Sequence, residues 1–227
     1  MARRRGRRGQ HGHDEPGVDP ARLDAEKKSL RAREQNAAAR DAWRAELAAS
    51  PAADLVFLDE TGSHLGYTPT HAWAPRGQRA HATAPRNPGE NKTVIAALTR
   101  DGIGARLRFD GGMTSDRFAG YVRHVLAPTL RPGQVVIADN LAAHHTPGAR
   151  IAIEARGAQL RHRPPYSPEF NPIELLFAKV KQALRRAEAR TDDELRVATW
   201  AAFATLTPAD AAGCFAHCGY LDPQHPS

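Results

Sequence analysis

The chain alternates between short apolar runs, typical of buried strands, and longer stretches in which apolar residues recur every three or four positions, typical of helices. Strands are predicted at residues 55–58, 93–99, 105–109, 135–138 and 159–163. Asp101-Gly102 is a good hairpin turn, and Leu107 and Phe109 alternate with arginines in the run that follows it. The second and third runs therefore predict an antiparallel hairpin.

Helical periodicity fills most of the remaining chain. Thr114 or Ser115 caps a helix that runs to about residue 126, and further helices are predicted at 148–156, 171–189 and 192–205. Residues 21–49 contain no Gly or Pro and predict another helix, whose sparse apolar positions indicate that it packs along a larger body. A hairpin followed by alternating helices and strands predicts an α/β fold with a mixed sheet.

The composition narrows the class of protein. Of the 227 residues, 41% are hydrophobic, which is enough for a core and excludes a wholly disordered chain. Two cysteines argue against a disulfide scaffold, and no apolar run approaches the roughly 18 residues of a membrane span. The N-terminus has no apolar stretch of the kind found in secretory signals. We expect a soluble, cytoplasmic protein that does not associate with membranes.

The net charge of +7 suggests a polyanionic partner such as nucleic acid. Five arginines lie within the first ten residues, and residues 1–20 are rich in Gly, Pro, Arg and His. This segment is predicted to be a disordered basic tail. It either touches phosphates without sequence preference or is simply solvated.

Two predicted strands are followed by acids, Asp59-Glu60 after the first and Asp139-Asn140 after the fourth. Ligands of α/β proteins gather beyond the carboxyl ends of strands, where an aspartate is well placed to hold a cation. Each acid by itself also fits an ordinary strand-end turn, and Glu60 fits either a supporting role beside Asp59 or a structural one.

A third acid, Glu174, lies near the start of the helix predicted at 171–189. With Asn171 as the N-cap and Pro172 at the first helical position, Glu174 completes a good capping arrangement. At about 100° per residue, Glu174, Lys181 and Arg185 also share one stripe beside the apolar face. That stripe suits a carboxylate that binds metal and two bases that hold phosphates, or a mixed-charge solvated face.

Together these residues resemble the catalytic core of DDE transposases, and most of all the bacterial insertion-sequence branch of the mariner superfamily. The resemblance rests on Asp59 in LDETG, Asp139 in ADNLAAHH and Glu174 in PPYSPEFNPIELLFAKVK. The 34 residues between Asp139 and Glu174 are the interval that this branch favours. The resemblance covers about residues 54–190.

The resemblance implies an RNase H-like fold, a mixed sheet flanked by helices, with an N-terminal helical extension in this chain. It also implies that Asp59, Asp139 and Glu174 are catalytic and ligate two Mg²⁺ or Mn²⁺ ions. The implied reaction is DNA cleavage at transposon terminal inverted repeats, followed by strand transfer into target DNA at TA dinucleotides. The family works as a homodimer in its synaptic complex, and the implied location is the nucleoid.

The resemblance also extends to two of the predicted DNA-binding residues. Asn140 and His144 match the family's DNxxxH pattern, and His144 is placed near the metals or at a phosphate, or is a plain loop histidine. The other candidate contacts to DNA are Lys181 and Arg185 on the stripe of Glu174, and Arg76 and Lys92, for which simple surface solvation is the default interpretation. Cys214, His217 and Cys218 lie at helical spacing but fall short of four zinc ligands, so core packing or free thiols are predicted instead.

Four segments are predicted: the tail at 1–20, a helical linker at 21–50, the catalytic domain at 51–190 and its C-terminal helical extension at 191–227. The family's helix-turn-helix modules are not recognisable in the first 50 residues. End recognition is therefore expected from an upstream helix-turn-helix protein or a frameshift fusion. Two other functions fit the sequence, a non-catalytic DNA-binding remnant and an RNase H-like endonuclease without strand transfer.

Overall fold

A five-stranded mixed sheet forms the centre of the molecule, in the strand order β3-β2-β1-β4-β5. A computed structural model describes residues 36–48 and 50–221, so the predicted tail at 1–20 and residues 21–35 of the predicted linker lie outside the described residues. The strands are β1 (Leu55–Ser63), β2 (Lys92–Thr99), β3 (Gly102–Asp110), β4 (Val135–Ala138) and β5 (Gln159–His162). β1 pairs antiparallel with β2 and parallel with β4, which joins the hairpin to the parallel half of the sheet.

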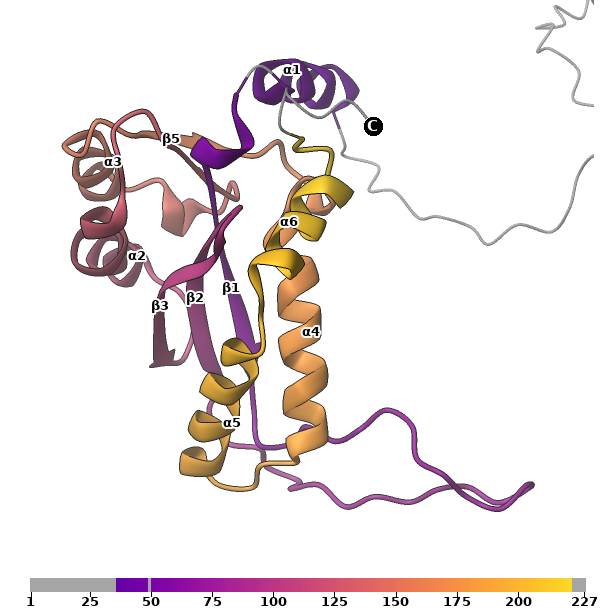
Figure 1. The fold of residues 1–227 in the computed structure, drawn as a ribbon. Helices are drawn as coiled ribbons and strands as arrows, with labels where there is room; N and C mark the ends of the chain where they lie inside the picture. Colours follow the sequence, from indigo (N-terminus) through magenta and orange to yellow (C-terminus); the bar gives the residue numbers. More distant parts are fainter. Residues whose placement is uncertain (1–35, 49, 222–227) are drawn as a thin grey trace, which may run out of the picture. The chain divides into compact units, whose positions relative to one another are not determined.

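Helices cover both faces of the sheet, as Figure 1 shows. α2 (Ser115–Tyr121), which a π-helical turn at Val122–Leu126 extends, lies with α3 (Pro147–Glu154) on one face. α4 (Pro172–Ala187), α5 (Asp192–Ala204) and α6 (Pro208–His217) lie on the other. The two layers enclose separate cores, because successive residues of a strand face opposite sides of a sheet.

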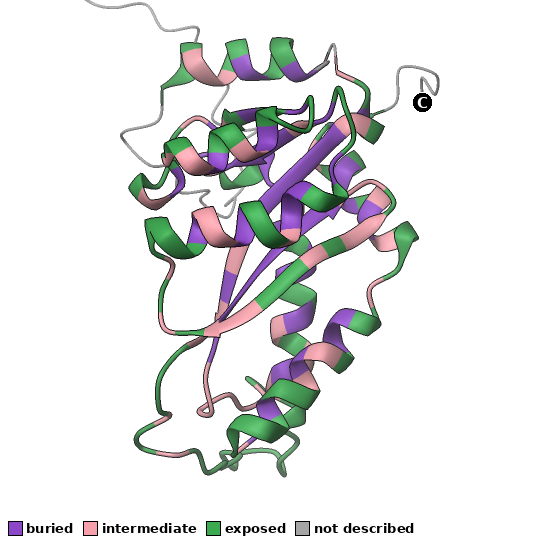
Figure 2. Ribbon diagram, turned by 90° about the vertical axis from the view of Figure 1, so that its left-hand side faces the viewer, coloured by how far each residue is buried: buried purple, intermediate pink, exposed green. Residues whose placement is uncertain are grey.

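The residues of β1 show this alternation. Leu55 and Phe57 belong to the core beneath α4, α5 and α6, whereas Val56 and Leu58 belong to the core beneath α2 and α3. All four side chains are at most 2% exposed. Figure 2 shows the buried residues along the sheet and on the inner sides of the helices. Side chains of β1 therefore reach both layers.

The N-terminal helix α1 (Ala37–Ala48) packs on the core through Trp43 and Leu47. Trp43 Nε1 donates a hydrogen bond of 3.4 Å to the hydroxyl of Tyr220, which in turn donates to the carbonyl of Phe170 at 2.8 Å. The described part of the predicted linker therefore packs along the larger body, as its sparse apolar pattern predicted.

Most predicted elements are confirmed within two or three residues, and three elements of the fold differ. Within the described residues, the helix predicted at 21–49 is helical only at Ala37–Ala48, since Asn36 is not helical and its side chain accepts a hydrogen bond from the Ala39 N–H. β1 continues to Ser63 rather than turning at Asp59, because its residues 57–63 pair with β2. α6 was not predicted as a helix at all. It is capped by Thr207 and Asp210, whose side chains each accept from the other residue's backbone N–H in a capping box.

The segment between β1 and β2, residues 64–91, forms neither helix nor strand and extends away from the sheet in Figure 1. Its base is held by Arg190, whose guanidinium donates to the carbonyls of Leu65, Tyr67 and Thr83. Trp73 within it is fully exposed. We call residues 64–91 the arm.

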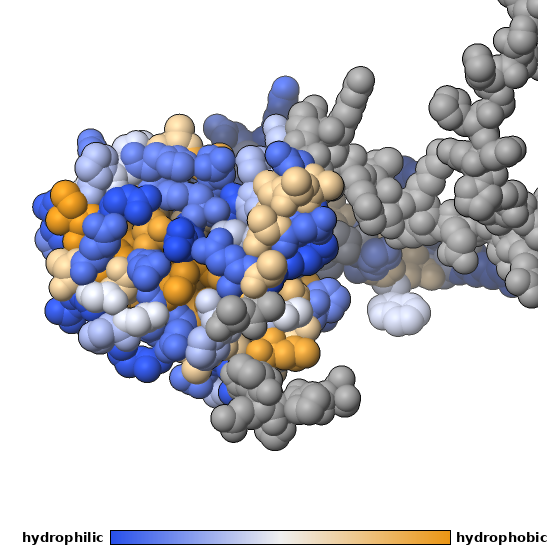
Figure 3. Space-filling model, turned by 90° about the horizontal axis from the view of Figure 1, so that it is seen from above, coloured by the Kyte–Doolittle hydropathy of each residue, from blue (hydrophilic) through white to orange (hydrophobic). Residues whose placement is uncertain are grey.

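None of the described helices is both long enough and apolar enough to cross a membrane. Seen from above, the surface is largely hydrophilic, and apolar side chains are confined to small patches (Figure 3).

Candidate active site beyond the end of β4

Asp59 lies on the part of β1 that runs past the neighbouring strand. The pairing of β1 with β4 ends at Phe57 and Ile137, whereas its pairing with β2 continues through Asp59 to Ser63. Asp139 follows β4 directly. Asp139 thus follows its strand as predicted. Asp59, predicted just after the first strand, lies within β1 instead, two residues past the last pair with β4.

Glu174 approaches from helix α4, whose apolar face anchors it on the core. Ile173, Phe177, Val180 and Leu184 are at most 4% exposed, as the periodicity predicted. Glu174 itself is exposed in the first turn of the helix. The chain therefore presents a carboxylate at the sheet edge from a rigidly packed helix.

The capping interpretation of Asn171 is wrong in one respect. Asn171 occupies the N-cap position and Pro172 the first helical position, but the Asn171 side chain makes no capping hydrogen bond. Its Nδ2 instead donates to Asp59 Oδ2 at 2.5 Å, 112 residues away in sequence. The side chain that could cap α4 supports an acid of the candidate site.

Two cavities meet at Glu174. One, of about 400 Å³, is lined by Asp59, Glu60, Glu174, Phe177, Ala178 and Lys181. The other, of about 360 Å³, is lined by Asp139, Asn140, Leu141, Glu174 and the segment from Arg163 to Pro168. Because Glu174 lines both cavities, it links Asp59 on one side with Asp139 on the other. The structure thus gathers the three predicted acids around one region.

Arg163 was not singled out from the sequence. Its side chain is 6% exposed, and one guanidinium nitrogen lies 3.9 Å from Asp59 Oδ2. Another nitrogen donates to the carbonyl of Ser167, and the residue also lines the cavity that contains Asp139. A sequence signal was available, since Arg163 follows β5 as Asp139 follows β4, at the same edge of the sheet.

His144 is buried between two acids. Its Nε2 lies 3.0 Å from Glu60 Oε1, and its Nδ1 lies 2.5 Å from Asp139 Oδ1 at an angle outside hydrogen-bond geometry. Burial disfavours the charged imidazolium, but the contacts with Asp139 and Glu60 outweigh it and raise the pKa of His144 to about 10. Glu60 is thus the partner of His144, a role that the sequence left open.

The two aspartates differ in their environments. Burial raises the pKa of Asp59 to about 7, with further increases from the charges of Glu60 and Glu174, while the Glu60 amide and Arg163 act in the opposite direction. Burial would also raise the pKa of Asp139, but its contact with His144 and the Leu141 amide holds it below the usual value. Asp59 therefore carries the larger cost of uncompensated negative charge.

The oxygen atoms of Asp59, Asp139 and Glu174 are the kind of ligands that a hard divalent cation takes. Within residues 36–48 and 50–221, however, no three acidic, His or Cys side chains lie close enough together to hold a metal ion in their present positions. All three predicted ligands are carboxylates, the oxygen donors that Mg²⁺ and Mn²⁺ prefer. The Oδ1 atom of Asn171, beside Asp59, is buried and has no hydrogen-bond partner. A cation would supply the positive charge that Asp59 lacks.

The predicted DNA-binding residues are placed unequally. Lys181 lines the cavity of Asp59 and Glu174, and Asn140 lines the cavity of Asp139 and accepts a hydrogen bond of 2.7 Å from His145 Nε2. Arg185 lies one turn farther along α4, where its guanidinium stacks on Tyr67 of the arm. Arg76 is exposed on the arm.

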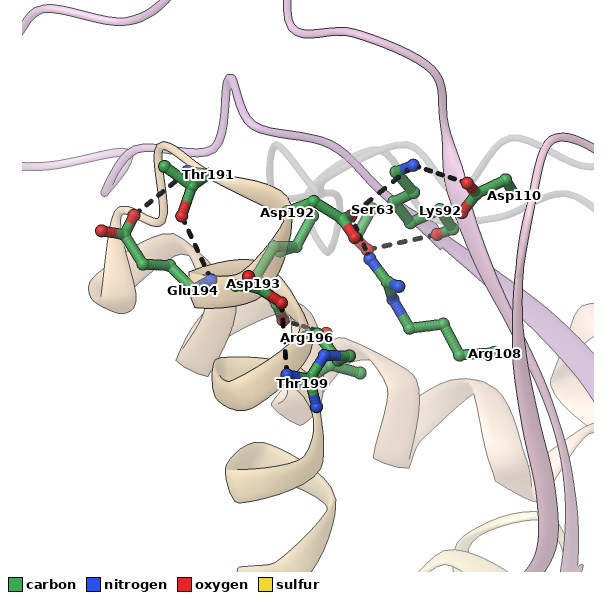
Figure 4. A network of polar contacts seen from close by, with 11 residues as sticks. Ser63, Lys92, Arg108, Asp110, Thr191, Asp192, Asp193, Glu194, Arg196 and Thr199 are labelled. Carbon is green, nitrogen blue, oxygen red and sulfur yellow. Dashed lines mark hydrogen bonds and ion pairs between the residues drawn. The ribbon is translucent and has the colours of Figure 1, made fainter.

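Lys92 lies in a polar network between the sheet and α5 (Figure 4). Its ammonium is 2.9 Å from Asp110 and 3.5 Å from Asp192, and Arg108 also contacts Asp192 at 2.5 Å. This environment gives Lys92 a structural role in joining β2, β3 and α5. Cys214 is buried in the core and Cys218 is half-buried, and both are free.

Comparison with solved structures identifies the fold. A crystal structure of the Mos1 mariner paired end complex with Mn superposes with a TM-score of 0.69 at 17% identity, over 86% of this chain and 64% of that chain. The catalytic domain of Mos1 mariner transposase gives a TM-score of 0.62 at 13% identity, over 86% of this chain and 92% of that one. The fold is the RNase H-like mixed sheet flanked by helices that the sequence resemblance implied.

The chain thus spans less than two thirds of the length of the Mos1 chain in the paired end complex. No curated protein sequence matches it. A family model described as DDE superfamily endonuclease matches residues 54–196, which include Asp59, Asp139 and Glu174. That match covers more than half of the sequence, and the chain therefore belongs to the DDE superfamily endonuclease family.

Proposed function

We propose that this chain is the catalytic part of a DDE transposase that cleaves DNA and joins the released end to a target. The observation that carries the proposal is the position of Glu174, which lines the cavity of Asp59 and the cavity of Asp139 together. Three carboxylates from a strand, a strand end and a helix thereby surround one place, and a family of endonucleases matches the same residues.

In this proposal Asp59, Asp139 and Glu174 hold two Mg²⁺ or Mn²⁺ ions. Bound there, the ions stabilise the attacking and leaving oxygens of an in-line displacement at phosphorus. The same site serves two successive reactions, hydrolysis of a phosphodiester at the element's end and attack of the freed 3′-hydroxyl on target DNA. No residue of the chain needs to bond covalently to the DNA.

The side chains around the acids prepare the site for this reaction. Asn171 holds one oxygen of Asp59, and Arg163 limits repulsion near it from the buried side. Lys181, half-buried in the cavity of Asp59 and Glu174, offers its ammonium to a phosphate of the bound strand. These residues orient the acids and the DNA.

The DNA partner is also part of the proposal. Solved relatives include the Mos1 transposase paired-end complex with left transposon end and the Mos1 strand transfer complex. For this chain we propose terminal inverted repeats and TA targets as substrates, a homodimer as the synaptic form, and the bacterial insertion-sequence branch as its place in the family. A helix-turn-helix partner and a nucleoid location remain predictions.

A cleavage and joining assay tests the proposal. The substrates are the element's own ends, recognised in flanking DNA as inverted repeats bounded by duplicated TA, presented as intact and as pre-cleaved duplexes with Mg²⁺ or Mn²⁺. We expect cleavage of the first and joined product from the second, and Asp139→Asn should reduce both to the uncatalysed background.

The outcomes separate the alternatives. Cleavage without joined product from pre-cleaved ends would indicate a nuclease that lacks strand transfer. DNA binding without cleavage, and without any stabilisation by divalent metal, would indicate a non-catalytic remnant. Full activity of Asp139→Asn would contradict the assignment of the acids.

A further inference from the structure

The loop that follows β4 carries Asp139 beyond the support of the sheet. Backbone pairing with β1 ends at Ile137, and on the other side the last bond is donated by the Arg163 N–H to the Ala138 carbonyl at 2.9 Å. The loop's own amide at Leu141 donates to Asp139 Oδ1 at 3.2 Å. A carboxylate placed here needs a further contact to hold one orientation.

His144 provides that contact from inside the protein. It lies in a 3-10 turn at Ala142–His144, is 1% exposed, and its ring packs on Phe118 of α2 with centroids 4.3 Å apart. Both ring nitrogens face carboxylate oxygens, Asp139 on one side and Glu60 on the other. Because the ring is this deeply buried, DNA cannot reach it. The position of His144 therefore does not support the predicted DNA contact.

Glu60 connects this chain of contacts to the sheet. Side chains alternate along β1, so Asp59 lies toward α4, where Asn171 binds it, and Glu60 lies toward α2 and His144. Two neighbouring residues of β1 thus serve the site in different ways. Both residues line the cavity that contains Glu174, but it is the carboxylate of Glu60 that contacts His144, which in turn lies against Asp139.

We propose that Glu60 and His144 are positioning residues that fix the Asp139 carboxylate for divalent metal binding. We call the three side chains Glu60, His144 and Asp139 the histidine bridge. The bridge substitutes for the backbone pairing that ends at Ile137, because it ties the loop after β4 to the part of β1 that runs past β4. Groups that orient metal ligands in this way commonly change metal affinity by about 10–100-fold when they are removed. The inference rests on the proposed function, since it concerns the same acids.

The test measures the Kd for Mn²⁺ of the purified full chain without DNA by isothermal titration calorimetry. Circular dichroism of the metal-free protein reports folding separately. We expect His144→Ala and Glu60→Ala each to weaken Mn²⁺ binding about 10–100-fold. Glu60→Gln should weaken it less, because its amide oxygen can still accept from His144 Nε2. The double variant should be no weaker than His144→Ala alone, since both residues act through one contact.

The matched control is His145→Ala. This neighbouring histidine is exposed, contacts Asn140 and stacks on His162, so its removal should leave the Kd for Mn²⁺ unchanged. If His144→Ala does not fold, Glu60→Ala and His144→Asn replace it in the same Mn²⁺ titration. The short amide of His144→Asn can approach Asp139 but not Glu60. We expect both variants to bind Mn²⁺ more weakly than the wild type.

Several results would overturn the bridge. Folded Glu60→Ala and His144→Ala proteins with the wild-type Kd would exclude a positioning role. Weaker binding in Glu60→Ala alone would make Glu60 a metal ligand instead. If the wild-type chain itself neither binds Mn²⁺ nor cleaves DNA, the proposed function fails, and the bridge fails with it.

Discussion

Lys181 and Lys92 carry the same charge and differ in what surrounds it. Lys181 lines the cavity of Asp59 and Glu174, whereas the ammonium of Lys92 is held by Asp110 and Asp192. A cation that is already paired has less to gain from a phosphate, because it must give up its partners to bind one. The position of each lysine, rather than its charge, therefore decides what it can contribute to the proposed DNA binding.

We expect Lys181→Ala to weaken binding to duplex DNA and to reduce the slope of log K against log salt by about 1, the loss of one phosphate contact. Lys92→Ala should leave that slope unchanged and lower the thermal unfolding midpoint instead. Fluorescence anisotropy over a salt series measures the first effect and circular dichroism the second. Equal salt slopes for the two variants would contradict this assignment.

The sequence identified the three acids because they stand in recognisable motifs, but it did not identify what holds them. Asn171 has a good local capping pattern, and only the fold brings Asp59, 112 residues away, within reach of its amide. The partner of Glu60 is 84 residues away. Local patterns say which residue types are available, and the choice between a local and a distant partner depends on tertiary packing.

α6 illustrates the same limit for a helix. Its buried residues Ala211, Cys214 and Phe215 stand at helical spacing, but two of the three side chains are small, and the glycine at 213 weakens the helical signal. The capping box of Thr207 and Asp210 was a usable signal, and Phe215 and Cys214 are buried where the helix meets the core. Helices and strands with strong periodicity were predictable, whereas the length of β1 depended on its pairing with β2.

Thr207→Ala should destabilise the chain by about 1 kcal/mol, the usual cost of losing an N-cap. Urea unfolding followed by circular dichroism measures this.

Lys179 and Thr207 lower the pKa of Asp210 from 3.8 to about 2. A lowered pKa in the folded state means that the stabilisation is complete above pH 4 and is lost as the pH falls toward 2.

The pH dependence can be isolated with Asp210→Asn. The difference in unfolding midpoint between the wild type and this variant should be constant above pH 4 and shrink as the pH approaches 2. A difference that does not change with pH would show that the carboxylate charge of Asp210 does not stabilise α6.

Helix α1, near the start of the described residues, and the segment after α6, near their end, meet in a buried contact. Trp43 of α1 is 6% exposed and reaches Tyr220, which follows α6 and packs on Phe57 of the central strand with ring centroids 4.9 Å apart. Segments that are far apart in sequence thus share the core beneath α4, α5 and α6. The mixed sheet was predictable from the order of its elements, and its RNase H-like character from the family resemblance. The contact between Trp43 and Tyr220 was not predictable, because a sparse apolar pattern does not say where a helix docks.

Trp43→Ala should cost about 3–5 kcal/mol, as expected for removing a large buried aromatic side chain. Urea unfolding monitored by far-UV circular dichroism is the suitable measurement, because Trp43 is itself one of the three fluorescent tryptophans. Substitution of the exposed Trp73 on the arm is the control and should have little effect. A similar small effect at Trp43 would mean that α1 contributes little to stability.

The three acids do not share one support. Asp59 is fixed by strand β1 and Asp139 by the loop after β4, but Glu174 is fixed by the packing under α4, where Ile173, Phe177 and Val180 fill the core. If the acids hold metal as proposed, the position of Glu174 relative to Asp59 and Asp139 is set by the thickness of that hydrophobic layer. Mg²⁺ tolerates less distortion of its ligands than larger cations do. Evolution of the interior beneath α4 is then constrained by ionic radius as well as by stability.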